Sequence, residues 1–131
     1  MIGLDTNILV RFFTHDDPCQ VPHAERLMKS LTRTEPGWIA LATILELVWV
    51  ITSKAGGNRR EVIPILDFLL ARDEIVIEQS SVIESALQKF RSGNADFADC
   101  LIAASAAAAG CSRTVTFDRI AARDTGMQLI G

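Results

Sequence analysis

The chain has 131 residues, of which 49% are hydrophobic and 22% charged, and its formal net charge is −3 at pH 7. This length and apolar content predict one domain, residues 1–131, with a real core, and they exclude disorder. The mild negative charge excludes a basic surface that attracts nucleic acid by its overall field. Three cysteines match no zinc spacing, and no signal peptide or membrane span is visible, so we expect a cytoplasmic protein.

Short apolar runs alternate along the chain with segments whose apolar residues recur at helical spacing. The apolar runs predict strands at residues 2–4, 38–40, 75–77, 115–117 and 127–130. The periodic segments predict helices at residues 8–13, 21–31, 43–52 (ending near Gly56 and Gly57), 59–71, 80–90, 96–109 and 118–123. Apolar strands that alternate with helices indicate an α/β fold with a short parallel β-sheet flanked by helices on both faces.

Four acidic residues stand alone in, or at the end of, strongly apolar segments: Asp5, Glu46, Asp99 and Asp118. A carboxylate among apolar residues costs several kcal/mol unless it is neutralised, paired or bound to a metal. Glu46 is the one charged residue between Gly37 and Ser53, so we expect it to be shielded from solvent. Since no matching cations accompany these acids, we expect them to share a divalent metal ion.

The predicted elements bring these acids toward one edge of the sheet. Asp5 and Asp118 directly follow strands, and sites in open α/β sheets form beyond the carboxyl ends of strands. Glu46 lies early in the helix after a strand, while Asp96 and Asp99 share one face of a helix. Oxygen ligands without His or Cys select Mg²⁺ or Mn²⁺ over zinc. We therefore predict Asp5, Asp99, Glu46 and Asp118 as metal ligands, with Asp96 contacting the ligands rather than the ion.

Four motifs in this order resemble the PIN-domain family, in its branch of VapC-like toxin ribonucleases. They are IGLDTNIL at residues 2–9, ILELVWV at 44–50, DFADCLIAA at 96–104 and VTFD at 115–118. Each motif alone is weak, but the ordered set covers nearly the whole chain. The resemblance implies a PIN-like three-layer fold, and it implies that Asp5, Glu46, Asp99 and Asp118 are the four catalytic acids of the family.

The resemblance also implies an activity and partners. Family members of this branch are Mg²⁺- or Mn²⁺-dependent endoribonucleases that cleave RNA phosphodiester bonds with metal-activated water. They are usually homodimers, and a cognate antitoxin of a type II toxin–antitoxin pair holds them inactive. Because arginine pairs carboxylates bidentately, we expect the antitoxin to insert a basic side chain near Asp5 and Asp99.

Simpler interpretations of the same residues remain open. Asp5 and Asp118 are also helix N-caps, and Asp99 also complements a helix dipole. The alternative functions are a PIN-fold protein-binding module and a different Mg-dependent phosphohydrolase, although Asn7 stands where an aspartyl-phosphate enzyme carries a second Asp. Further candidates are residues that would orient water or contact phosphate: Thr6, Asn7, Arg11 and Arg119. The sequence leaves open which RNA is cut and whether one ion or two are bound.

Overall fold

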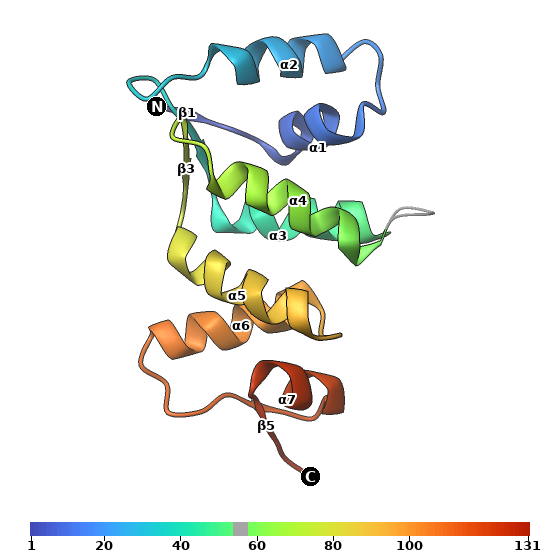
Figure 1. Cartoon of the computed structure of the whole chain (residues 1–131), viewed down its shortest axis with the longest axis vertical. Coiled ribbons are helices and arrows are strands. Elements are labelled where there is room, and N and C mark those ends of the chain that lie inside the picture. The colour runs from blue at the N-terminus through green and yellow to red at the C-terminus, as the bar shows by residue number, and fades with distance from the viewer. Residues whose placement is uncertain (54–57) are drawn as a thin grey trace. The chain divides into compact units, whose positions relative to one another are not determined.

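The computed structural model describes residues 1–53 and 58–131, and these fall into two compact units, Met1–Glu78 and Gln79–Gly131 (Figure 1). Each unit is described by itself. The predicted end of the third helix near Gly56 and Gly57 lies outside the described residues. The single domain predicted over residues 1–131 from length and composition stays a prediction.

The first unit is a parallel sheet with its connecting helices. Its elements are β1 (Ile2–Gly3), α1 (Thr6–Thr14), α2 (Val21–Ser30), β2 (Gly37–Ile39), α3 (Leu41–Ser53), α4 (Arg59–Leu70) and β3 (Ile75–Ile77). The strands pair in the order β1-β2-β3, with Gly3 opposite Trp38 and Trp38 opposite Val76. Each step from one strand to the next passes through two helices, which is the length of crossover that parallel pairing requires.

Apolar side chains at helical spacing build the core of the first unit. On α3 the buried residues are Ile44, Leu47, Val48 and Ile51, which recur every three or four residues and so form one stripe. Gly37 is the first residue of β2, and only a glycine fits there without a shift of its neighbours. A Cβ at this position would lie 2.8 Å from Leu4 Cδ1 and 2.9 Å from Leu31 Cδ1. These two leucine side chains thus pack closely against the backbone at the start of the strand.

The second unit contains a packed helical pair, a third helix that contacts the pair, and a small parallel ribbon. Its elements are α5 (Ser80–Ser92), α6 (Phe97–Ala108), β4 (Val115–Thr116), α7 (Arg119–Thr125) and β5 (Gln128–Leu129). Helices α5 and α6 bury Ile83, Leu87 and Leu101, and the rings of Phe90 and Phe97 meet edge to face at 5.6 Å. Strand β4 pairs with β5 in parallel, and α7 connects them.

The predicted α/β class with parallel strands is confirmed, as are the predicted helices and strands apart from shifts of a few residues at their ends. Within residues 1–53 and 58–131, the five strands belong to two sheets, one in each unit. The third helix begins at Leu41 rather than at residue 43, and the last begins after Asp118, which caps it. Among the described residues, no helix is both long and apolar enough to cross a membrane.

Candidate functional site

Asp5 lies in the connection between β1 and α1 in the first unit, as the N-cap residue of α1. Its backbone is extended, with φ −77° and ψ 158°, and its Oδ1 accepts a hydrogen bond of 2.8 Å from the backbone N–H of Thr6. A short acidic side chain fits this N-cap position because it satisfies an amide that the helix leaves unpaired. The cap thus fixes one predicted acid at the end of a strand.

Thr6 connects Asp5 with Glu46. Thr6 is buried, 5% exposed, and its hydroxyl donates a hydrogen bond to Glu46 Oε1 on α3. One residue therefore holds both predicted acids of the first unit, one through its amide and the other through its hydroxyl. The sequence prediction assigned Thr6 to water or phosphate and missed this contact. A hydroxyl residue at the first buried position of a helix is the signal that points to it.

Shielding of Glu46 from solvent was expected, and this expectation is wrong. Glu46, Leu45 and Trp49 are all exposed on α3. The reason is geometric, because a single helix buries one stripe of side chains and Glu46 lies outside the buried stripe of α3. Asp5 and Asp118 are exposed as well. Their apolar neighbours in the sequence therefore do not enclose these three carboxylates.

Asp99 is the half-buried acid of the second unit, in the first turn of α6. Burial raises the pKa of its carboxyl above the ordinary value, and the nearby negative charges of Asp96 and Asp118 raise it further. Asp96 occupies the N-cap position of α6, but its side chain makes no capping hydrogen bond. Asp96 and Asp118 are thus each close enough to repel the carboxylate of Asp99.

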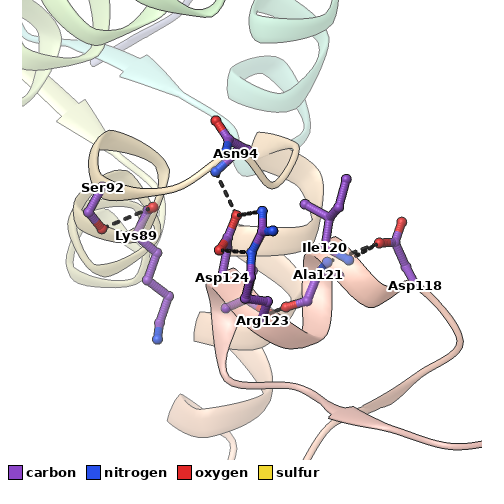
Figure 2. A network of polar contacts seen from close by, with 9 residues as sticks. Lys89, Ser92, Asn94, Asp118, Ile120, Ala121, Arg123 and Asp124 are labelled. Carbon is purple, nitrogen blue, oxygen red and sulfur yellow. Dashed lines mark hydrogen bonds and ion pairs between the residues drawn. The ribbon is translucent and has the colours of Figure 1, made fainter.

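Asp118 caps the next helix. Its Oδ1 accepts hydrogen bonds from the backbone N–H groups of Ile120 at 2.8 Å and Ala121 at 3.0 Å, as Figure 2 shows. Its own N–H donates to Thr116 Oγ1 at 3.0 Å. Since both capping bonds end on Oδ1, Oδ2 takes part in neither and stays available to a ligand. Capping and ligation are therefore compatible at this residue.

The two phosphate-contact candidates differ. Arg11 donates through Nε to Gln20 at 2.7 Å and pairs through Nη1 with Asp16 at 3.3 Å. These contacts hold its guanidinium at the connection between α1 and α2, so its predicted availability to phosphate is not supported. Arg119 is exposed directly after Asp118 and remains a candidate.

The donor set suits a hard divalent cation in its chemistry. Every predicted ligand offers carboxylate oxygens, and the mutual repulsion around Asp99 is of the kind that a cation reverses. Within either unit, however, residues 1–53 and 58–131 contain no group of three or more His, Cys, Asp or Glu side chains already placed to hold an ion. Joint ligation by Asp5, Glu46, Asp99 and Asp118 therefore stays a prediction.

A cavity of about 510 Å³ lies elsewhere in the second unit. It is lined by α5, by the second half of α6 and by the segments before β4 and β5, with Lys89 and Arg113 as its basic residues. None of the predicted acids lines it. The cavity is thus separate from the acids at the start of α6.

Comparison with known proteins adds one finding. A family model described as the PIN domain matches residues 2–125. The match spans both compact units and includes all four predicted acids. A comparison with curated proteins finds no significant match to this chain.

Proposed function

The chain belongs to the PIN-domain family, whose domains are generally metal-dependent nucleases, and from that premise we propose that it is a toxin-type endoribonuclease. The observation that carries the proposal is the state of Asp99. Burial and two neighbouring carboxylates all raise its pKa, so the protein holds negative charge together at a cost. Such clusters are characteristic of sites that bind cations or do chemistry.

We assign the metal to Asp5, Glu46, Asp99 and Asp118, with Asp96 beside them. All-oxygen donors favour Mg²⁺ or Mn²⁺. Such an ion, when bound, acidifies water and offsets charge on a phosphate. The chain's own residues would do the positioning: Thr6 holds Glu46, and the backbone amides of α7 hold Asp118.

The proposed reaction is hydrolysis of an RNA phosphodiester bond. Water attacks the scissile phosphorus in line, the bond from phosphorus to the 3′ oxygen breaks, and that oxygen leaves with a proton. The products are a 5′-phosphate and a 3′-hydroxyl. Arg119, exposed next to Asp118, is the side chain that we assign to a neighbouring phosphate.

The proposed partners follow from the charge and the exposed apolar residues. A cognate antitoxin would insert an arginine or lysine near Asp5 and Asp99 and so compete with the ion. Leu45 and Trp49 are 37% and 67% exposed one helical turn apart on α3, beside Glu46. We propose this face for contact with the antitoxin or with a second copy in a homodimer. The proposed setting is the cytoplasm, where the RNA substrates are.

Metal binding by the antitoxin-free protein is the first test of the proposal. Mn²⁺ would be titrated into wild type, Asp5→Asn and Asp99→Asn, and free Mn²⁺ followed by electron paramagnetic resonance. Both variants are expected to lose the binding seen in wild type, although the two residues lie in different units. Glu84→Gln, a loss of one exposed charge on α5, is the matched control and should bind as wild type does.

Cleavage of a mixed RNA substrate in Mg²⁺, with analysis of the ends produced, completes the test. Wild type should produce 5′-phosphate ends. Asp99→Asn should be slower by about a hundredfold or more, because losing a metal ligand would weaken binding of the ion that offsets the developing phosphate charge. Unchanged Mn²⁺ binding in both aspartate variants would reduce Asp5 to a helix cap and Asp99 to an acid of the first turn of α6. The chain would then be a PIN-fold binding module.

A further inference from the structure

Asp124 lies at the centre of a polar network that the proposed function does not use. Its Oδ2 accepts a hydrogen bond of 2.7 Å from the backbone N–H of Asn94. Arg123 donates to the same carboxylate, through Nε to Oδ1 at 2.9 Å and through Nη2 to Oδ2 at 3.1 Å (Figure 2). The Asp124 side chain is 13% exposed, whereas that of Arg123 is 61% exposed. The acid is therefore the inner member of the pair.

The position of Asp124 is poor for helix stability. It lies in the last turn of α7, which ends when Gly126 adopts φ 82°. An acidic side chain near a helix C-terminus opposes the helix dipole, where a basic one would be favoured. Its bonds to Asn94 and Arg123 offset that cost, so the contact with the Asn94 segment accounts for the acid.

A glycine makes this contact possible. A Cβ built on Gly93 would lie 2.9 Å from Asp124 Cβ and 3.0 Å from Asp124 Cγ. The backbone of Gly93 has φ −135° and ψ −168°, which any residue adopts. The glycine is therefore needed for the close approach of Asp124 and not for an unusual backbone conformation.

The two segments that meet at Asp124 both lead to predicted ligands. Asn94 is followed by the buried Ala95 and then by Asp96, the N-cap residue of α6, whose first turn contains Asp99. Asp124 belongs to α7, the helix that Asp118 caps. One carboxylate thus ties the segment entering α6 to the helix that Asp118 caps.

We propose that Asp124 is a positioning residue for the acidic cluster of the second unit. It holds the start of α6 against α7, so that Asp99 and Asp118 stay close in spite of their repulsion. The inference rests on the proposed function, because its purpose is to keep these acids within reach of one cation. Residues that keep the ligands of a metal ion in place commonly control the affinity of the site.

A pair of substitutions at one position separates positioning from charge. Asp124→Asn and Asp124→Ala remove the same negative charge and the same ion pair with Arg123. Asn keeps an oxygen that accepts from the Asn94 amide, whereas Ala does not. Gly93→Ala is a third variant, which pushes Asp124 away without changing any charge.

The measurements are Mn²⁺ affinity by electron paramagnetic resonance and hydrogen exchange of the Asn94 amide by NMR, both on the full chain. Asp124→Ala and Gly93→Ala should weaken Mn²⁺ binding by roughly tenfold to a hundredfold, the usual effect of losing a residue that orients a ligand. Both should also speed exchange at Asn94. Asp124→Asn should recover most of the affinity and the protection, and thermal melts would establish that each variant is folded.

The outcomes distinguish the two proposals. Equal Mn²⁺ affinity in Asp124→Asn and Asp124→Ala, with wild type binding normally, would overturn the positioning role and leave the proposed function intact. Wild type that binds no Mn²⁺ at millimolar concentration would overturn the proposed function and, with it, the role of Asp124. Faster exchange at Asn94 without any loss of affinity would make Asp124 a structural residue alone.

Discussion

The two acids of the first unit, Asp5 and Glu46, differ from Asp99 of the second unit in how the fold holds them. In the first unit, Asp5 and Glu46 each accept a hydrogen bond from Thr6, so folding itself satisfies them. In the second unit, Asp99 is half-buried between like charges from Asp96 and Asp118, and its pKa is raised. Carboxylates thus stabilise the first unit through their contacts, whereas the second unit holds the unfavourably placed Asp99 beside the helix-capping Asp118.

This difference shows which acids are informative about function. A carboxylate that caps a helix or accepts from a buried hydroxyl contributes to stability whether or not it binds a ligand. A carboxylate held against its own kind does not, and natural proteins keep such strain mostly at functional sites. Asp99 is therefore stronger evidence for a functional site than Asp5, although the two residues are equally prominent in the sequence motifs.

Loss of the hydrogen bond from Thr6 to Glu46 is expected to have the largest effect, and it tests whether the first unit holds its acids through Thr6. Thr6→Val keeps the shape of the buried side chain but removes the hydroxyl that Glu46 accepts from. We expect RNA cleavage to slow by roughly tenfold to a hundredfold, because a ligand-orienting bond is lost. Initial rates at saturating Mg²⁺ measure the effect.

Thr6→Ser is the matched control, since it retains the hydroxyl. It should cleave at close to the wild-type rate, and thermal melts should show both variants folded. Equal slowing in Thr6→Val and Thr6→Ser would mean that the packing of the methyl group matters, rather than the bond to Glu46. The first unit would then not hold its acids as proposed.

Loss of the helix cap at Asp118 is expected to have a smaller effect, on stability. It separates the capping role of this side chain from the effect of its charge. Asp118→Ala should destabilise the protein by about 1 kcal/mol because the amides of Ile120 and Ala121 lose their acceptor. Asp118→Asn keeps an acceptor and should lose little stability. Urea unfolding measures both. Equal destabilisation by the two substitutions would indicate that the charge, rather than the cap, stabilises α7.

Much of the fold was predictable because its signals are local. Asp5 and Asp118 fall at N-caps as their sequence neighbours indicate, and the apolar runs Ile75–Ile77 and Val115–Thr116 are strands. Burial of single acids was not predictable in this way. The apolar residues around Glu46 lie on different faces of α3. A run of apolar residues in the sequence therefore does not surround the side chain of Glu46 in the folded protein.

The contacts that hold the candidate site could not be predicted from the sequence either. The bond from Thr6 to Glu46 joins residues on different helices, and the bond from Asn94 to Asp124 joins a loop to a helix end. No local spacing encodes either pair. No sequence motif singles out Asp124, whereas its packing against Gly93 gives it a definite place.

The pH dependence of stability gives the smallest effect and the most direct comparison of the two units. The pKa of Asp99 is raised in the folded state, by burial first and then by Asp96 and Asp118. In acid, below the pKa of the unfolded chain, Asp99 is neutral in both states and costs nothing. As pH rises through the folded-state pKa, the folded protein must accept an unfavourable charge, so its stability falls.

Asp99→Asn should therefore melt at a higher temperature than wild type near pH 7 without metal, and the gain should vanish in acid. The gain is modest because water screens a half-exposed carboxylate. Asp5→Asn, which keeps an N-cap acceptor, should show no such gain at any pH. Melting curves in a chelator at a series of pH values test both variants. A pH-independent gain in Asp99→Asn would trace the effect to packing, and the contrast between the two units would lose its electrostatic basis.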